Sequence, residues 1–260
     1  MSESKVILIS VDGMRPDGFL ACGNPFVQWM MEHSSYTLDG KTVFPTVTLP
    51  CHMSMFHSVT PQRHGITTNL YIPMARPVSG LFEQLQRSGK TCAMYYGWEP
   101  IRDVARPESL TFSEFIHAYS EEDTDTLLTD SALARITRSE PDFVFLYLVE
   151  TDDKGGHDNG WMTQAYLDRI SVALDNIRRV VEACGETYTI FVTADHGGHD
   201  RTHGTDLPED ETIPMFCMGK QFEQGNRFYG GSILDLAPTI ARVMGIPAAP
   251  EWEGNVLPMK

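Results

Sequence analysis

The sequence predicts an α/β fold in which a mainly parallel sheet lies between helices. Three short apolar runs, Lys5–Val11, residues 143–149 and Tyr188–Thr193, have the continuous hydrophobic character of strands that are covered on both faces. Helical patterns separate these runs, and such alternation is typical of parallel sheets. Each run also stops at acidic or histidine side chains, so we expect those polar groups to meet at one edge of the sheet.

The elements between these strands follow from apolar periodicity and from proline. Pro45 and Pro50 exclude a central strand over residues 42–50 and suit an irregular approach to a helix, because proline lacks the donor that a sheet needs but fits the first helical turn. In chain order, the other predicted elements are a loop and helix over 16–32, a helix over 50–59, a helix over 79–88, a strand over 91–96, a helix over 122–139, a helix over 166–184, an edge strand over 210–218, a helix over 232–244 and a coil over 245–260.

The composition is that of an ordinary globular protein with an acidic surface. The chain has 260 residues, 42% of them hydrophobic, which suits a single domain over residues 1–260 with a sizeable core. Twenty basic residues against 35 acidic ones give a net charge of −15, so long nucleic acid is an unfavourable partner. A small molecule is the expected partner, and the oligomeric state stays open.

The cysteines and the apolar runs bear on the expected location. Five widely spaced cysteines without a Cys-x-x-Cys pair argue against a disulfide framework and a thiolate zinc site, and favour a reducing compartment. No secretory leader is visible, and no apolar run approaches the roughly 20 residues that span a bilayer. We therefore expect a cytoplasmic protein without a membrane span.

The polar residues that follow the three strands form a candidate metal site. They are all carboxylates or imidazoles, which suit zinc, manganese, iron or magnesium, and they outnumber the three or four ligands that one ion needs. We therefore predict a centre with two divalent metal ions, which favours in-line phosphoryl or sulfuryl transfer. The candidates are Asp12, Asp152, Asp153, His157, Asp195, His196, His199 and His203.

Thr48 is the candidate nucleophile of this site. It stands at the entrance of the predicted helix over 50–59, where backbone donors can neutralise a phosphoryl oxygen, and a metal ion can lower the pKa of its hydroxyl. Thr46 is a rival, only two residues away.

Five motifs then carry a family resemblance that covers residues 5–245. Together they resemble the type I phosphodiesterase/nucleotide pyrophosphatase family of the alkaline phosphatase superfamily. The motifs are Ile-Ser-Val-Asp12-Gly, Phe-Pro-Thr-Val-Thr48-Leu-Pro-Cys-His, Arg-His-Gly-Ile-Thr-Thr-Asn69, Asp153-Lys-Gly-Gly-His157 and Thr-Ala-Asp195-His196-Gly.

The resemblance implies an alkaline-phosphatase-like fold and hydrolysis of phosphodiester or pyrophosphate bonds in small molecules such as nucleotides. It implies two ions, usually zinc, with Thr48 as the nucleophile that forms a covalent phosphothreonine. Asn69 would help to bind a nonbridging phosphate oxygen. By position, the first ion would take Asp12, Thr48, Asp195 and His196, and the second would take Asp153, His157 and His203.

Three departures from the family pattern leave alternatives open. The Asp-x-x-x-His spacing selects Asp153, whereas a Glu-x-Asp register would select Asp152. Thr202-His203-Gly204 follows Asp195-His196-Gly197 almost at once, without the long insertion that the family usually has there. Residues 197–202 must therefore fold back across the site if His203 is the ligand, and His199 is the alternative. Because the missing span usually contributes to the substrate pocket, the physiological substrate stays open.

Two other kinds of function compete with this hypothesis. A phosphomonoesterase, phosphonate hydrolase or sulfatase would use the same fold, although Cys51 lacks the Cys-x-Pro-x-Arg context of a sulfatase nucleophile. A noncatalytic metal-dependent binding protein is the rival from another class.

Overall fold

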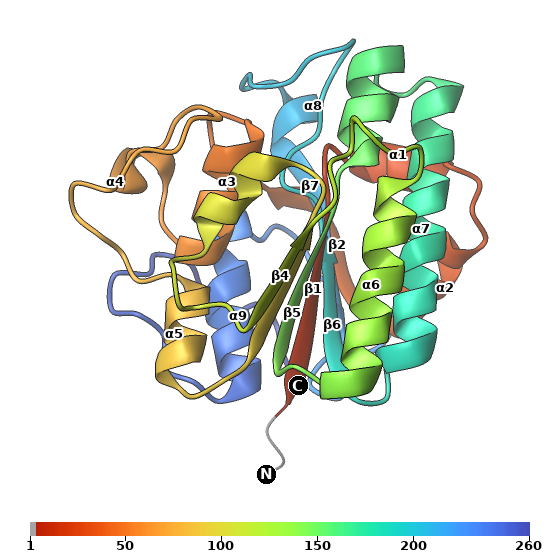
Figure 1. Ribbon diagram of the computed structural model, residues 1–260. Coiled ribbons are helices and arrows are strands. Elements are labelled where there is room, and N and C mark those ends of the chain that lie inside the picture. Colours follow the sequence, from red (N-terminus) through yellow and green to blue (C-terminus); the bar gives the residue numbers. More distant parts are fainter. Residues whose placement is uncertain (1–3) are drawn as a thin grey trace.

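The three apolar runs form the centre of the sheet in the computed structural model, which describes residues 4–260 (Figure 1). They are strands β1 (Lys5–Val11), β5 (Phe143–Leu148) and β6 (Tyr188–Thr193), as predicted. β1 lies between the other two and pairs in parallel with both, with Ser10 opposite Tyr147 and Thr193. Because all three strands run in the same direction, their carboxyl ends meet at one edge.

Within the described residues the sheet has eight strands in the order β4-β3-β5-β1-β6-β7-β2-β8. On one side of the centre, β3 (Cys92–Tyr96) and β4 (Phe112–Phe115) extend the parallel part. On the other side, β7 (Thr212–Met218) is antiparallel to β6, and β2 (Ser35–Lys41) and β8 (Asn226–Arg227) follow. The sheet is therefore mainly parallel, with antiparallel pairing around β7.

The prediction of an edge strand over residues 210–218 was wrong. β7 is an inner strand because β2 covers its free side from Ser35 to Lys41. The sequence of β2, Ser-Tyr-Thr-Leu-Asp-Gly-Lys, alternates buried and partly exposed side chains and contains polar residues, so it lacks a strong apolar signal. Its absence from the predicted elements left β7 apparently unpaired.

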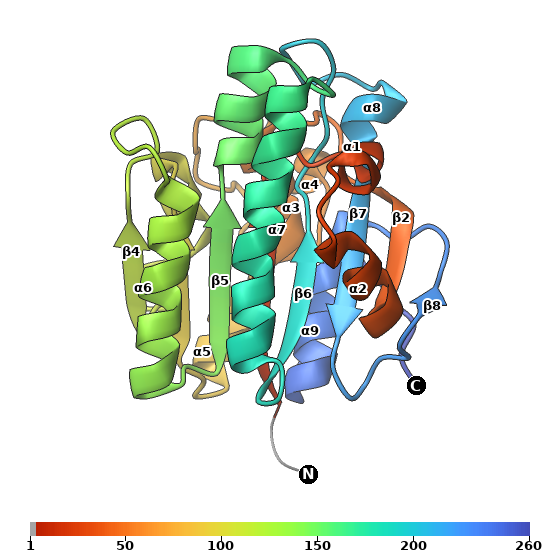
Figure 2. The same cartoon turned by 90° about the vertical axis from the view of Figure 1, so that its right-hand side faces the viewer.

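Helices cover both faces of the sheet (Figure 2). The longest of them, α7 (Gln164–Cys184), buries Ile170, Leu174 and Ile177 on its apolar side, as the periodicity predicted. One face carries α1 (Pro16–Ala21), α2 (Phe26–His33), α6 (Thr124–Ser139) and α7 (Gln164–Cys184). The other carries α3 (Thr48–His57), α4 (Pro61–His64), α5 (Leu81–Arg87) and α9 (Leu236–Met244).

Helix α3 begins two residues earlier than predicted, at Thr48. Pro50 then lies in its first turn, where backbone N–H groups have no partner within the helix and the missing donor of proline is harmless. The early start makes Thr48 the first helical residue, and all ten residues of α3 are buried.

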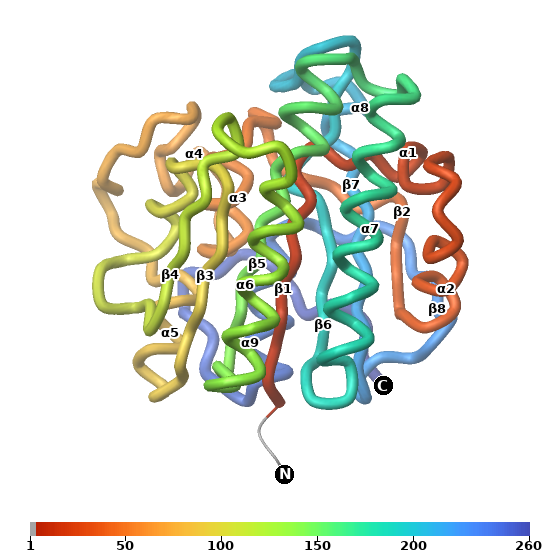
Figure 3. The backbone as a smooth tube through the Cα atoms, turned by 45° about the vertical axis from the view of Figure 1, so that its right-hand side comes forward, coloured from red at the N-terminus to blue at the C-terminus, as the bar shows by residue number. Residues whose placement is uncertain are grey.

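The direction of the parallel strands shows at which end of the molecule the candidate residues lie. Figure 3 shows β1 rising from the same end of the molecule as the C-terminus, so the carboxyl ends of the parallel strands lie at the opposite end. The short elements η1 (Glu99–Val104), α8 (Pro208–Glu211) and η3 (Ile233–Asp235) connect the larger ones. In the part of the chain that the structure describes, no helix combines the length and the apolar character needed to cross a membrane. All five cysteines are buried and unpaired.

Candidate metal centre

The ends of β1 and β6 bring three of the predicted residues together. Asp12 follows β1, and Asp195 and His196 follow β6, which is its neighbour in the sheet. His196 Nε2 lies 3.3 Å from Asp12 Oδ1 and 3.4 Å from Asp195 Oδ2. We call Asp12, Asp195 and His196 the first cluster; all three are buried, and their ligand-type atoms lie within 4.8 Å of one another.

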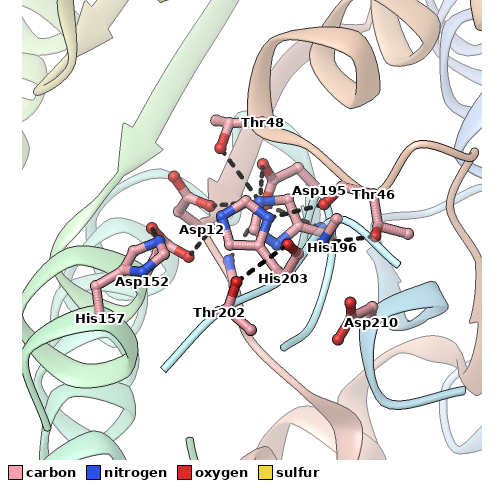
Figure 4. A network of polar contacts seen from close by, with 12 residues as sticks. Asp12, Thr46, Thr48, Asp152, His157, Asp195, His196, Thr202, His203 and Asp210 are labelled. Carbon is pink, nitrogen blue, oxygen red and sulfur yellow. Dashed lines mark hydrogen bonds and ion pairs between the residues drawn. The ribbon is translucent and has the colours of Figure 1, made fainter. Parts of the chain in front are cut away.

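Asp152, His157 and His203 form a second cluster beside the first (Figure 4). His157 Nε2 lies 3.3 Å from Asp152 Oδ2, and His203 Nε2 lies 3.8 Å from Asp152 Oδ1. The rings of His196 and His203 stack with centroids 3.9 Å apart, so the two clusters adjoin. Residues 197–202 thus fold back across the site, as the seven-residue spacing required.

The structure places Asp152 in the second cluster and not Asp153, which the sequence spacing had favoured. The cause is the backbone, because Thr151–His157 is a π-helix and not an α-helix. A π-helix repeats near i to i+5, which aligns Asp152 with His157, whereas the i to i+4 repeat of an α-helix would align Asp153. Asp153 instead lines a separate hollow of about 550 Å³ together with Tyr119 and Lys154.

His199, the alternative to His203, has another partner. Its Nδ1 lies 2.8 Å from Oδ1 of Asp210, a carboxylate that is fully buried. The other oxygen of Asp210 accepts hydrogen bonds from the backbone and the hydroxyl of Thr205. His199 therefore helps to shape the loop that carries His203.

Three buried carboxylate oxygens in the two clusters have no hydrogen-bond partner. They are Asp12 Oδ1, Asp152 Oδ1 and Asp195 Oδ2, one from each carboxylate. Leaving such groups unpaired in a protein interior is unfavourable unless a cation neutralises them. This arrangement fits divalent ions, because each cluster also offers the imidazole nitrogen that zinc accepts readily.

Without a cation, the negative charges of the neighbouring carboxylates in the first cluster repel one another. Burial raises the pKa of Asp195 to about 8, and the neighbouring charge of Asp152 adds to this shift. Burial and the charges of Asp195 and Asp152 likewise raise the pKa of Asp12 well above its usual value. Burial lowers the pKa of His196 to about 3, which keeps its ring neutral and able to bind a metal.

In the second cluster, a carboxylate and a histidine instead stabilise each other's charged forms. A hydrogen bond with Asp152 raises the pKa of His157 to about 9, and the His157 side chain is 41% exposed. Burial acts to raise the pKa of Asp152, but the hydrogen bond with His157 and the nearby histidines bring it below its usual value. This cluster is therefore an ion pair open to solvent that a metal would have to separate.

Thr48 lies against the first cluster at the start of α3. Its Oγ1 is 3.2 Å from His196 Nε2, and the residue is 5% exposed. Asn69 reaches the same helix terminus, where its Oδ1 accepts a hydrogen bond from the Leu49 backbone N–H at 3.0 Å. That bond leaves the side-chain NH₂ of Asn69 as the group available to a ligand. Thr48 and Asn69 thus lie at the same helix terminus.

Two supporting residues were not predicted from the sequence. The Tyr147 hydroxyl on β5 donates a hydrogen bond to Asp12 Oδ2. Trp161 donates from Nε1 to the Gly13 carbonyl at 2.9 Å, and its ring meets His157 edge-on with centroids 5.3 Å apart. A Cβ atom at Gly156 would lie 2.5 Å from this indole, which explains a glycine in the Asp-Lys-Gly-Gly-His motif. Neither residue had a signal in the sequence beyond apolar character.

Comparisons with known proteins identify the family of this chain. A model of the Type I phosphodiesterase / nucleotide pyrophosphatase family matches residues 6–210. The chain is 31% identical over 165 residues to a 2,3-bisphosphoglycerate-independent phosphoglycerate mutase of Aeromonas salmonicida, covering 59% of this chain and 30% of that protein. It is 24% identical over 196 residues to mouse ectonucleotide pyrophosphatase/phosphodiesterase family member 1, covering 67% of this chain and 21% of that protein. The chain thus spans less than a third of the length of these relatives.

Solved structures share the fold at low sequence identity. An inactive variant of murine ectonucleotide pyrophosphatase/phosphodiesterase 5 in complex with AMP has a TM-score of 0.82 at 16% identity, with 97% of this chain and 98% of that chain covered. The phosphonate monoester hydrolase of Silicibacter pomeroyi has a TM-score of 0.77 at 14% identity, with 98% and 76% covered. The 2-O GAG sulfatase BT1596 has a TM-score of 0.77 at 15% identity, with 98% and 73% covered. The fold is therefore alkaline-phosphatase-like, and with the family match over residues 6–210 the chain belongs to the type I phosphodiesterase / nucleotide pyrophosphatase family.

Proposed function

We propose that this chain is a metal-dependent hydrolase of phosphodiester or pyrophosphate bonds in small molecules, with Thr48 as its nucleophile. The observation that carries the proposal is the position of the Thr48 hydroxyl, 3.2 Å from His196 Nε2 at the first residue of α3. A hydroxyl beside a metal-type cluster and a helix N-terminus has both the means of activation and the positive environment that phosphoryl transfer needs.

Two divalent ions are part of this proposal, with zinc the foremost choice and manganese, iron and magnesium the alternatives. Asp12, Asp195 and His196 would hold the first ion together with Thr48, and Asp152, His157 and His203 would hold the second. When bound, two such ions supply charge neutralisation for the entering and leaving oxygens. Imidazoles in both clusters favour zinc over magnesium, which prefers oxygen ligands.

The residues of the chain would perform the reaction in two balanced steps. In the first, the Thr48 oxygen bonds to phosphorus, the bond to the leaving alcohol or phosphate breaks, and the leaving group departs with a proton. In the second, water adds to the phosphothreonine, which restores the Thr48 hydroxyl and releases a phosphate monoester. The Asn69 NH₂ would donate to a nonbridging oxygen during both steps, because its Oδ1 is held by Leu49 N–H.

A nucleotide is the substrate class that the relatives support best. The murine structural neighbour was solved with AMP, and a mouse relative is an ectonucleotide pyrophosphatase/phosphodiesterase. The net charge of −15 argues against long nucleic acid. The same proposal includes a single domain without the usual insertion. It also includes a cytoplasmic location, which the unpaired cysteines favour.

Phosphomonoester, phosphonate or sulfate ester hydrolysis is the alternative on the same fold, since structural neighbours include a sulfatase and a phosphonate monoester hydrolase. A sulfatase is the weakest of these, because Cys51 is fully buried and its Sγ points to backbone carbonyls of Val43 and Pro45. A noncatalytic binding protein is disfavoured by the presence of Thr48 beside the first cluster.

The test compares hydrolysis of bis-p-nitrophenyl phosphate and p-nitrophenyl phosphate in the presence of zinc or manganese. We expect the diester to be preferred and Thr48→Ala to lower kcat by at least about a thousandfold. Thr137→Ala, an exposed threonine at the far end of α6, is the matched control and should keep wild-type activity. Equal turnover by Thr48→Ala would refute the nucleophile, and a strong monoester preference would refute the diesterase assignment.

A further inference from the structure

Thr46 attaches the loop that carries His203 to the segment that carries Thr48. We define the His203 loop as residues 197–210. Its two ends are joined by backbone hydrogen bonds from Gly197 to Asp210 and from Gly198 to Glu209, at 2.8 and 3.0 Å. These bonds close the loop, but they do not orient the imidazole of His203.

Thr46 makes three hydrogen bonds to three consecutive residues of this loop. Its backbone carbonyl lies 2.8 Å from His203 Nδ1, its hydroxyl accepts from the Gly204 N–H at 3.1 Å, and its hydroxyl donates to the Thr205 carbonyl at 2.8 Å. Thr46 itself is fully buried and its three bonds to the loop are partly buried; Figure 4 shows Thr46 close to His203. The hydroxyl is thus used as donor and acceptor at once, which no apolar side chain can reproduce.

The contact with the carbonyl sets the chemical state of the His203 ring. A carbonyl oxygen only accepts, so Nδ1 must carry a proton, and in the neutral ring Nε2 then presents its lone pair. Nε2 is the atom that faces Asp152 Oδ1 at 3.8 Å. Holding one imidazole nitrogen by an outer hydrogen bond is a general way to orient a metal-binding histidine.

We propose that Thr46 is a positioning residue for the second metal ion: its carbonyl selects the His203 tautomer and its hydroxyl fixes residues 204 and 205. This role replaces its candidacy as a nucleophile, because its hydroxyl is already committed to backbone groups. Since Thr46 lies two residues before Thr48, it also ties the second cluster to the segment that presents the nucleophile. The inference rests on the two-metal centre proposed above.

The experiment measures zinc binding to the whole chain by calorimetric titration in wild type, Thr46→Val and Thr46→Ser, with His203→Ala as the reference for a lost second ion. We expect Thr46→Val to weaken the second ion by about 10–100-fold while the first ion keeps its affinity, and Thr46→Ser to restore binding to within about threefold. Wild-type affinity for both ions in Thr46→Val would overturn the proposal.

Thr239→Val is the matched control. Thr239 is also fully buried, and its hydroxyl also donates to a backbone carbonyl, of Asp235, and accepts from a backbone N–H, of Leu257. It lies on α9, so its loss should lower stability without changing either ion affinity. Equal weakening of the second ion by both variants would overturn a specific role for Thr46.

A measurement on the unmodified chain covers the case in which Thr46→Val does not fold. In zinc-loaded, histidine-labelled protein, nitrogen NMR should show the His203 signal, identified by its loss in His203→Ala, with a proton on Nδ1. A bare Nδ1 would overturn the proposal. If the wild type binds no zinc at all, the two-metal centre itself fails, whereas two ions in wild type and in Thr46→Val would refute only the role of Thr46.

Discussion

The two clusters of the centre are built in different ways. The first takes Asp12 and Asp195 from the ends of neighbouring strands β1 and β6, and all of its residues are buried. The second takes Asp152 from a π-helix and His203 from a loop, and it reaches the surface at His157. The first is therefore held by the ladder of the sheet, whereas the second depends on local backbone geometry and on supporting hydrogen bonds. We expect the ion affinity of the first cluster to fall more when a ligand residue is replaced. We expect the ion affinity of the second cluster to fall more when a residue that hydrogen-bonds to a ligand is replaced.

The largest effect is expected from Asp195→Asn in the first cluster. Asparagine keeps an oxygen for the Gly13 and His196 N–H groups but removes the charge that would face the ion. Because the first cluster is more deeply buried than the second, water should replace a lost ligand less readily there, and affinity for the first ion should fall at least about a thousandfold, or ~4 kcal/mol. Calorimetric titration with zinc measures this affinity. A fall of less than tenfold would show that burial does not make the first cluster more sensitive to the loss of a ligand.

Asp152→Asn should have the next largest effect, limited to the second ion. We expect a loss of about a hundredfold, or ~2.7 kcal/mol, because solvent near His157 can partly replace the missing ligand. Asp153→Asn is the control on the adjacent position and should change the affinity by no more than about threefold. A larger loss of affinity in Asp153→Asn than in Asp152→Asn would mean that the functional backbone is α-helical over residues 151–157.

The enclosed carboxylate of Asp195 should also give the metal-free protein a characteristic pH dependence. The folded state holds this proton up to about pH 8, whereas the unfolded chain releases it near the ordinary value of 3.8. Stability from this group is therefore present at low pH and is lost as the pH rises, by about 2 kcal/mol between pH 6 and pH 8. Urea unfolding in the presence of a chelator measures the free energy of unfolding at each pH. This free energy should fall less steeply with pH in Asp195→Asn than in wild type, and parallel curves would contradict the raised pKa of Asp195.

The smallest of these effects is expected from Tyr147→Phe. This change removes the hydroxyl that donates to Asp12 Oδ2 but keeps the fully buried ring. Affinity for the first ion should fall about tenfold, at the lower end of the range for outer-shell groups, because the sheet still holds Asp12 in place. Zinc competition with a chromophoric chelator measures this change. A loss larger than that of Thr46→Val at the second ion would contradict the greater dependence of the second cluster on its supports.

Sequence reasoning predicted the central sheet correctly and led us to expect Asp12, Asp195 and His196 at its edge, because both inferences follow from short-range patterns. The apolar runs of β1, β5 and β6 are continuous, and each stops abruptly at polar residues such as Asp12 and Asp195. Parallel pairing then brings those residues together without any further detail. Strand β2 was missed for the converse reason, since its polar and partly exposed residues carry little periodic signal.

The sequence by itself determined the class of fold, the family and the residue types of the centre, because these depend on apolar periodicity and on the spacing of motifs. Only the tertiary structure groups Asp152, and not Asp153, with His157, since an α-helix and a π-helix of the same sequence turn different carboxylates toward that histidine. It also gives the two histidines different partners, which are the carbonyl of Thr46 for His203 and the carboxylate of Asp210 for His199. Such choices rest on hydrogen bonds between distant segments, which no local pattern encodes.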